Sequence, residues 1–315
     1  MKITILDGFA VNPGDLDWGI LEPYGTVTVY DRTDSDAESI ERIGDSEIIL
    51  VNKTPLPAAV IEACPSIRMI GMLATGYNIV DVECAKKHGI PVTNVPCYST
   101  NSVAQFAIAL LLEVCHHCGR HNILVHEGAW TSCQDFCLWT TPQMELAEKT
   151  LGIIGYGRIG QQTAKIAEAL GMNVITYSRS HNADGNYVDL DTLLRESDVI
   201  SLHCPLFPET KEIISRENIT KMKDGVILIN TARGGLIDEQ AVSDALASGK
   251  IRGAALDVIT VEPIRKENPL LSAPNCLITP HMAWTPIEAR RRLLNTVCDN
   301  IRCFTEGQPQ NVVNP

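Results

Sequence analysis

The stretch that decides the fold is TLGIIGYGRIG, residues 150–160, near the middle of the chain. Its first five residues form an apolar run typical of a buried strand, and a GxGxxG spacing follows at once. A helical pattern then continues to about Leu170. Turn glycines let a pyrophosphate approach the backbone, and the N-terminus of the next helix offers unpaired N–H groups. The stretch predicts a dinucleotide site formed by these residues: Gly155, Gly157, Arg158, Ile159 and Gly160.

Size and charge narrow the class of protein. The 315 residues suit about two domains, and a hydrophobic content of 45% is enough for a core in each. The net charge of −12 argues against nucleic acid or an anionic membrane as the main partner, because either favours a basic surface. We expect no signal peptide, no membrane segment and a cytoplasmic location, in which the eleven cysteines stay reduced.

Short apolar runs alternate with helical patterns along the whole chain, which predicts an α/β fold. The second half contains six candidate strands, the number in a complete Rossmann dinucleotide-binding domain: 150–154, 173–177, 199–203, 226–230, 253–257 and 276–279. The first half contains five, sufficient for a flavodoxin-like parallel sheet: 2–6, 26–30, 47–51, 69–73 and 92–95. We therefore predict two parallel-sheet domains.

Two long helical patterns set the expected domain boundaries. One runs from Asn101 to about Val125 and the other from Pro286 to about Phe304, and we expect the second to pack back on the N-terminal half. The prediction is a Rossmann domain, residues 100–283, inserted into a substrate domain, residues 1–99 and 284–315. Hinges are expected near residues 99–101 and 281–286, with the active-site cleft between the domains.

The run Cys115-His116-His117-Cys118 resembles metal-ligand spacing when His121 is added. It lies within the apolar helical pattern, however, and no second CxxC pair follows to complete a structural zinc site. We predict a partly buried helix here and no metal in the protein.

Polar residues follow three predicted strands of the second half, at the edge where open α/β sheets bind ligands. Arg233 follows the strand 226–230, Asp257 ends the next strand and Glu262 follows it, and His281 follows the last strand. Reduction of a 2-oxo acid needs a proton donor, a group that keeps the donor charged, and a cation for the carboxylate. Histidine, glutamate and arginine meet these three needs.

Taken together, these motifs resemble the D-isomer-specific 2-hydroxyacid dehydrogenase family. The resemblance covers almost the whole chain, because Leu73-Ala74-Thr75-Gly76-Tyr77-Asn78 is similar to the family's substrate-carboxylate loop and Ser102-Val103-Ala104 to its helix start beside the nicotinamide. Within the family, the chain looks most like the glycerate dehydrogenase and hydroxypyruvate reductase branch.

The resemblance implies a role for each matched residue. His281 is the acid/base, and Glu262 favours its charged form so that it donates a proton near neutral pH. Arg233 binds the substrate carboxylate and polarises the carbonyl, while backbone N–H groups of Thr75 and Gly76 hold the other carboxylate oxygen. The remaining cofactor contacts fall to Ser102, Cys204, Thr231, Ala232 and Asp257.

The second Rossmann strand departs from the pattern of NAD-preferring folds, which place an acidic residue near its end. This chain has Ser178 and Arg179 there, and arginine can pair with a 2′-phosphate. We predict NADP(H) in preference to NAD(H). The alternative is that Arg179 points to solvent and Ser178 tolerates either ribose.

The expected substrate is hydroxypyruvate or glyoxylate, small 2-oxo acids that suit a crowded pocket. Trp139 is either a packing residue or, as the resemblance suggests, part of a loop that crosses a homodimer interface and narrows the partner's pocket; Trp284 is a second candidate for the pocket wall. Phosphoglycerate and D-lactate dehydrogenases are the alternatives within the family, the former disfavoured because no long C-terminal extension follows Gln310. A dinucleotide-sensing corepressor-like scaffold is the alternative outside enzymes.

Overall fold

The computed structural model describes residues 1–180 and 184–315, which form two compact units. The first consists of Met1–Ser99 and Thr285–Pro315, and the second of Thr100–Trp284. Each unit is built on one parallel β-sheet, so the predicted α/β class with two parallel sheets is confirmed.

The second unit contains a six-stranded sheet in the order β11-β10-β9-β8-β6-β7. The central strand β6 pairs with β7 on one side and β8 on the other, so the chain reverses direction of winding at β6. The strands are β6 (Thr150–Ile154), β7 (Asn173–Tyr177), β8 (Val199–Leu202), β9 (Val226–Asn230), β10 (Ile251–Leu256) and β11 (Cys276–Ile278). This is the doubly wound arrangement that binds ligands beyond the carboxyl ends of the strands.

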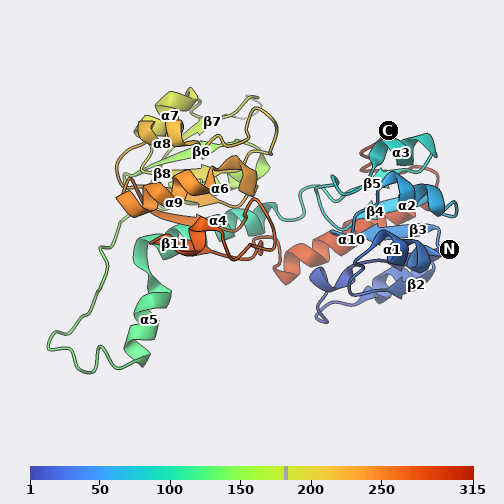
Figure 1. Cartoon of the computed structure of the whole chain (residues 1–315), viewed down its shortest axis with the longest axis horizontal. Coiled ribbons are helices and arrows are strands. Elements are labelled where there is room, and N and C mark those ends of the chain that lie inside the picture. Colours follow the sequence, from blue (N-terminus) through green and yellow to red (C-terminus); the bar gives the residue numbers. More distant parts are fainter. Residues whose placement is uncertain (181–183) are drawn as a thin grey trace. The chain divides into compact units, whose positions relative to one another are not determined.

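Helices cover both faces of this sheet (Figure 1). One face buries apolar side chains of α7 (Leu190–Glu196), α8 (Arg216–Lys221) and α9 (Glu239–Ser248). The other buries those of α4 (Thr100–His116) and α6 (Arg158–Ala169). Because both faces are covered, the strands are almost continuously apolar, as expected for parallel sheets.

The predicted single helix 101–125 is wrong: the structure has two helices, α4 and α5 (Cys118–His126), with a bend of 55° between them. The break is at His117, which adopts a left-handed conformation with φ 48°. The carboxylate of Glu113 on α4 accepts a hydrogen bond from the Gly119 N–H, in the first turn of α5. Cys115 is buried on α4 and Cys118 is exposed on α5, so the two cysteines do not share one helix face.

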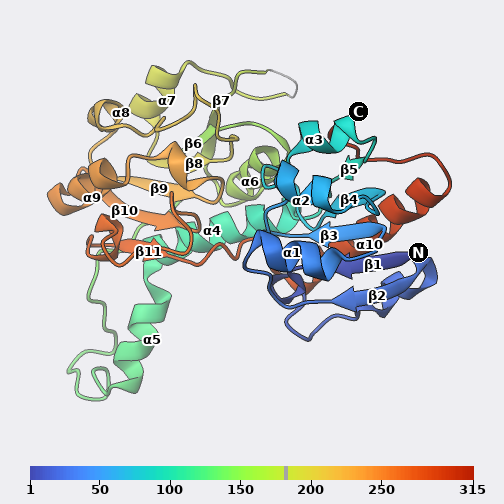
Figure 2. The same ribbon diagram turned by 45° about the vertical axis from the view of Figure 1, so that its right-hand side comes forward.

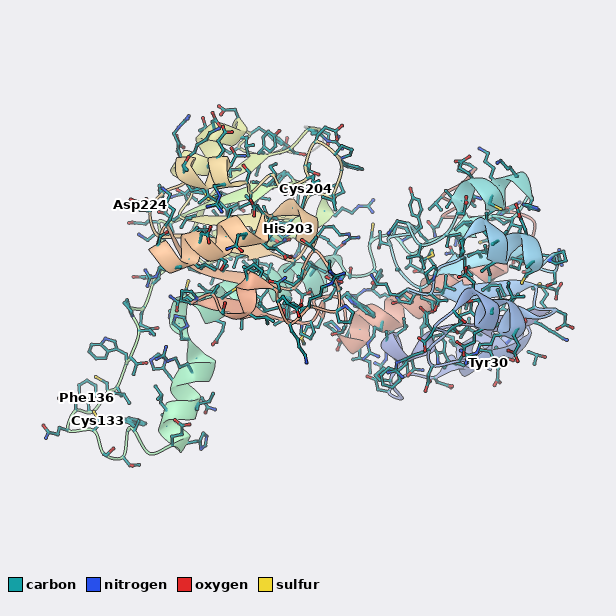
Figure 3. All side chains as sticks on the ribbon, viewed as in Figure 1. Tyr30, Cys133, Phe136, His203, Cys204 and Asp224 are labelled. Atoms are coloured by element: carbon teal, nitrogen blue, oxygen red, sulfur yellow. The ribbon has the colours of Figure 1, made fainter. Side chains whose placement is uncertain are left out.

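The helix α5 and the chain that follows it extend away from the rest of the second unit (Figure 2). None of the α5 residues is buried. We call residues 118–145 the arm. Its exposed apolar side chains include Ile123, Trp130, Phe136 and Trp139, and Phe136 lies near its end, far from the sheet (Figure 3).

The first unit contains a five-stranded sheet in the order β2-β1-β3-β4-β5. Its strands are β1 (Lys2–Ile5), β2 (Thr26–Val29), β3 (Ile48–Val51), β4 (Met69–Met72) and β5 (Val92–Thr93). Helices α1 (Asp36–Ile43), α2 (Ala58–Ala63) and α3 (Val82–Lys87) contribute to its apolar core. The C-terminal helix α10 (Ile287–Thr305) packs against β4, as the sequence predicted.

Across the described ranges, no single helix has the length and apolar composition needed to cross a membrane. The bent pair α4 and α5 meets that test of length and composition when the two are taken together.

Candidate active site

The glycine turn after β6 has one position that excludes a side chain and one that leaves room for a ligand. Gly155 has φ +100°, and a Cβ built on it would lie 2.4 Å from the backbone nitrogen of Cys204. At Gly157 a Cβ would meet no atom within 4 Å. Gly155 is therefore required by the fold, whereas the space at Gly157 is open to a bound group.

Gly157 is also the N-cap of α6 and has no side chain to cap the N–H groups of the first turn. Arg158 and Ile159 begin the helix, and a Cβ on Gly160 would lie 2.3 Å from the Gly155 carbonyl oxygen, so helix and turn pack closely. An open backbone surface at the positive end of a twelve-residue helix suits a diphosphate. These residues fit the dinucleotide that the sequence predicts.

Two further predicted cofactor residues lie at the end of β7. Ser178 is partly buried, and Arg179 is exposed. The Arg179 guanidinium lies 4.5 Å from the centre of the Phe207 ring, and its Nη1 is 3.8 Å from Oε2 of Glu209. Arg179 is therefore not simply directed into solvent, because an aromatic face and a carboxylate already contact it.

The carboxyl ends of β8 and β9 carry Cys204, Thr231 and Ala232. The Cys204 thiol is buried, which raises its pKa to about 11 and keeps it protonated. The Thr231 hydroxyl is buried without a hydrogen-bond partner among the described residues. A buried unpaired hydroxyl is costly, so Thr231 is suited to a polar ligand group. Ser102, also predicted to contact the cofactor, is buried on α4.

Strands β9, β10 and β11 end side by side, and this brings Arg233, Asp257 and His281 to the carboxyl edge of the sheet. In the sheet register Leu256 pairs with Asn230 on one side and with Ile278 on the other. The Asn230 side chain binds the turn that carries Arg233, donating to its carbonyl at 2.9 Å and accepting from the Ala232 N–H at 3.0 Å. The Arg233 side chain is exposed.

His281 and Glu262 form a hydrogen-bonded pair at this edge. The distance from His281 Nδ1 to Glu262 Oε2 is 2.7 Å, and their side chains are 30% and 35% exposed. Because the carboxylate accepts the proton of Nδ1, the Nε2 atom is left to exchange a proton with a substrate. The second Glu262 oxygen accepts from the Ile259 N–H at 3.2 Å, which orients the carboxylate.

Asp257 organises the backbone on which His281 lies. Its buried carboxylate accepts hydrogen bonds from the Thr279 hydroxyl at 2.6 Å and from the N–H groups of Met282 and Ala283 at 2.8 and 2.9 Å. Burial raises the pKa of Asp257, and these hydrogen bonds oppose that rise. His281 itself has φ 53°, an uncommon conformation for a residue with a side chain, and the bonds to Asp257 hold the turn in place.

The predicted substrate loop belongs to the first unit. The Thr75 hydroxyl donates to the Val95 carbonyl at 2.7 Å, and the Thr75 carbonyl accepts from the Asn94 side chain at 2.7 Å. Gly76 follows at a partly exposed position. The side chain and the carbonyl of Thr75 thus both form hydrogen bonds that fix the loop.

Sequence reasoning missed three residues that shape the site. Phe207 and Glu209, which contact Arg179, lie in the same loop as Cys204, and their closeness to that strand end in the sequence is the signal that could have indicated them. Glu239 on α9 accepts hydrogen bonds from the Thr260 N–H at 2.7 Å and the Asn268 side chain at 2.8 Å, and so fixes the loop that carries Glu262. Its partners are too far along the chain for a sequence motif to reveal.

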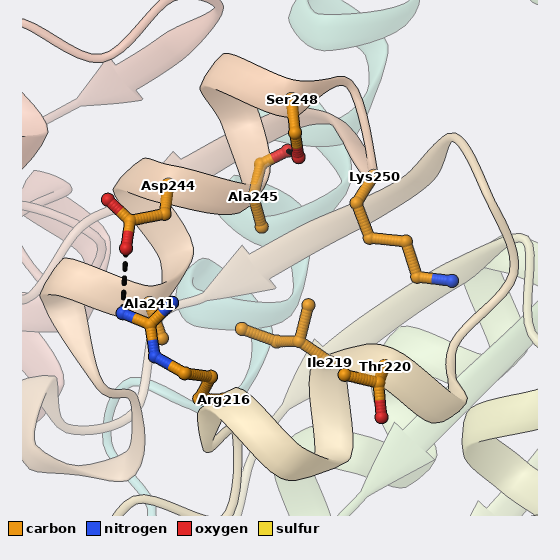
Figure 4. Close-up of a pocket in the computed structure, with 8 residues that line it drawn as sticks. All are labelled: Arg216, Ile219, Thr220, Ala241, Asp244, Ala245, Ser248 and Lys250. Atoms are coloured by element: carbon orange, nitrogen blue, oxygen red, sulfur yellow. Dashed lines mark hydrogen bonds and ion pairs between the residues drawn. The ribbon is translucent and has the colours of Figure 1, made fainter.

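A surface pocket between α8 and α9 does not involve these residues (Figure 4). Its charged groups pair with protein partners: Arg216 lies 2.6 Å from Asp244, and Lys250 lies 2.7 Å from Asp224. The candidate active site is therefore the strand-end edge.

Comparison with known proteins identifies the family of the chain. The model of the D-isomer specific 2-hydroxyacid dehydrogenase NAD binding domain matches residues 108–283. A hydroxypyruvate reductase of Blautia hydrogenotrophica is 58% identical over 321 aligned residues, covering 100% of both chains, and a glycerate dehydrogenase of Methylorubrum extorquens is 42% identical, covering 90% of both.

The structural comparison agrees with the sequence comparison. An acyclic imino acid reductase solved in complex with NADPH and D-Arg superposes with a TM-score of 0.87 at 32% identity, covering 99% of this chain and 100% of that one. The strand-end histidine, glutamate and arginine that suggested the resemblance thus lie within a matched fold. The chain belongs to the D-isomer-specific 2-hydroxyacid dehydrogenase family.

Proposed function

We propose that this enzyme reduces hydroxypyruvate, or a similarly small 2-oxo acid such as glyoxylate, to the D-2-hydroxy acid. The observation that carries the proposal is the His281–Glu262 pair, 2.7 Å apart at the carboxyl edge of a dinucleotide-binding sheet. Full-length similarity to a hydroxypyruvate reductase supports the choice of substrate. In this proposal the second unit holds the dinucleotide and the first contributes to substrate binding.

The residues divide the chemistry among them. The glycine turn after β6 would hold a nicotinamide dinucleotide, which would supply the hydride that C2 of the substrate receives. Arg233 pairs with the carboxylate and polarises the C2 carbonyl, and the N–H groups of Thr75 and Gly76 hold the second carboxylate oxygen. Protonated His281 gives its Nε2 proton to the carbonyl oxygen as the hydroxyl forms. Glu262 stabilises the charged imidazole before the transfer.

NADP(H) is the proposed cofactor in preference to NAD(H). Ser178 leaves the end of β7 without a carboxylate to accept the ribose 2′-hydroxyl, and Arg179 is the cation nearest to it in sequence. A related reductase in complex with NADPH supports this choice. Glu209 opposes it, because its carboxylate competes with a 2′-phosphate for Arg179. NAD(H) therefore stays the alternative.

A homodimer is the proposed assembly. The arm leaves Phe136 91% exposed and Trp139 64% exposed, a large apolar surface for a chain alone in water. Exposed apolar patches of this kind mark protein interfaces, and a second copy of the chain offers a self-complementary one. In this assembly Trp139 narrows the substrate pocket of the partner subunit. All eleven cysteines are free thiols, which fits the proposed cytoplasmic location.

A substrate panel run with both reduced cofactors tests the proposal. The purified enzyme is mixed with NADH or NADPH and with hydroxypyruvate, glyoxylate, pyruvate or a bulky aliphatic 2-oxo acid, and cofactor oxidation is followed. We expect hydroxypyruvate or glyoxylate to give the highest kcat/KM, with NADPH favoured. Faster turnover of the bulky acid contradicts the proposed substrate, and a strong NADH preference contradicts the proposed cofactor.

A further inference from the structure

Two consecutive N–H groups in the loop after β4, those of Thr75 and Gly76, donate to no group within the described part of the chain. Thr75 is exposed and Gly76 is partly exposed, so a ligand can reach both. In the proposed function they hold one oxygen of the substrate carboxylate. Donors of this kind bind an anion best when their direction is fixed before the ligand arrives.

The residues after β5 fix the direction of both N–H groups by binding the carbonyl oxygens of the same peptide groups. In a trans peptide group the N–H points away from the C=O, so a hydrogen bond to the oxygen sets the direction of the hydrogen. The Val95 N–H donates to the Ala74 carbonyl at 3.0 Å, which orients the N–H of Thr75. The Asn94 side chain donates to the Thr75 carbonyl at 2.7 Å, which orients the N–H of Gly76.

Asn94 is itself held through both of its main-chain polar groups. Its carbonyl accepts from the side chain of Asn300, which is buried on α10, at 3.0 Å. Its N–H donates to the Asn311 carbonyl at 3.1 Å. The Asn311 side chain donates to the Asn300 side chain at 2.8 Å, which joins the three asparagines in one network. The Asn94 amide therefore extends from a backbone that α10 and the segment 311–314 keep in place.

The segment 311–314 reaches Asn94 because it pairs with β5. The Val313 N–H donates to the Val92 carbonyl at 2.8 Å, and the Asn314 side chain accepts from the Val92 N–H at 2.8 Å. The Asn314 amide also donates to the Ile90 carbonyl at 3.0 Å, just before the strand begins. Asn314 thus binds the end of β5 that lies opposite to Asn94.

We propose that Asn94 is a positioning residue for the reduction, whose amide aims the Gly76 N–H at the substrate carboxylate. The inference rests on the proposed function, in which that N–H is one of the carboxylate donors. Without the Asn94 amide, the peptide group between Thr75 and Gly76 loses the bond that orients it, and the carboxylate loses part of a hydrogen bond. Because the carboxylate keeps its charge during hydride transfer, the loss should fall on KM rather than on kcat.

The test measures kcat and KM for hydroxypyruvate and glyoxylate, the cofactor Kd and the free energy of unfolding, in the full-length enzyme and in Asn94→Ala. A hydrogen bond to a charged group is worth about 10- to 100-fold, and a misaimed donor keeps part of it, so we expect KM to rise about 10-fold. The value of kcat should stay within about threefold of wild type, and the Kd of NADPH and of NADH should be unchanged. Asn94→Asp fills the same volume but has no proton to donate at neutral pH, so its KM should rise at least as far.

Asn314→Ala is the matched control, because it removes an amide that binds the same strand at its other end. It should lower the free energy of unfolding, while KM stays within about twofold of wild type. An equal rise of KM in Asn314→Ala, an unchanged KM in both Asn94 variants, or a fall in kcat at unchanged KM overturns the assignment of Asn94 and leaves the proposed reduction intact. A wild-type enzyme inactive on both acids overturns the proposed function, and the Asn94 assignment with it.

Discussion

Replacing Gly157 by alanine should weaken dinucleotide binding without destabilising the protein. Gly157 has φ −77°, which alanine adopts without strain, and its Cβ would meet no protein atom within 4 Å. The free energy of unfolding of Gly157→Ala without ligand should therefore stay within about 0.5 kcal/mol of wild type. The new methyl group occupies the space that the pyrophosphate needs, so the cofactor Kd should rise at least about tenfold, or about 1.4 kcal/mol.

Gly155→Ala is the matched control, for which we expect a loss of stability. With φ +100° and a Cβ 2.4 Å from the Cys204 nitrogen, alanine here incurs backbone strain of about 1–2 kcal/mol and overpacking of about 1–3 kcal/mol. Its free energy of unfolding should fall by about 2–5 kcal/mol. Chemical denaturation gives both stabilities, and quenching of tryptophan fluorescence by added NADPH or NADH gives the affinities. Wild-type cofactor affinity in Gly157→Ala would refute the assignment of the turn, as would a loss of stability equal to that of Gly155→Ala.

Three other predictions concern the acid/base pair, a partly buried histidine and the arm. Glu262→Gln should lower kcat about 100-fold with little change in KM, because the glutamine amide no longer favours the charged imidazole of His281. Steady-state kinetics at several pH values measure both constants, and an unchanged kcat would contradict the prediction. Burial lowers the pKa of His203 from 6.5 to about 4. As the pH falls from 6.5 to 4, the unfolded chain therefore takes up a proton at this residue before the folded chain does, and the free energy of unfolding falls by up to about 3 kcal/mol. In denaturation experiments, His203→Gln should reduce this dependence of the free energy of unfolding on pH. If the protein is the proposed homodimer, Phe136→Ser combined with Trp139→Ser should convert it to a monomer in sedimentation experiments, and a dimer that persists in this variant would show that the arm does not hold the two copies together.

The strands were predictable because their apolar runs are short, regularly spaced and bounded by turn residues. The strand 173–177 has the predicted bounds, and β10 begins two residues earlier than predicted, at Ile251. The glycine spacing located the turn after β6 for a physical reason, since two of its three glycines cannot accept a Cβ without a clash. Strands and glycine turns could be predicted because both depend on residues that are neighbours in the sequence.

What the sequence did not reveal depends on contacts between distant residues. The break at His117 follows no glycine or proline, and it involves a hydrogen bond from Gly119 back to Glu113. Glu239 acts on a loop more than twenty residues away through Thr260 and Asn268. The sequence gives no sign of a partner for the Arg179 side chain, whereas in the structure Phe207 and Glu209 contact it.

The most direct test of the proposed reaction is the stereochemistry of the product formed from hydroxypyruvate. The enzyme is incubated with hydroxypyruvate and excess NADPH, and in parallel NADH, and the glycerate is resolved by chiral chromatography. We expect D-glycerate alone, formed in proportion to the cofactor oxidised and abolished in His281→Ala. The appearance of L-glycerate, or of no glycerate with either cofactor, would contradict it.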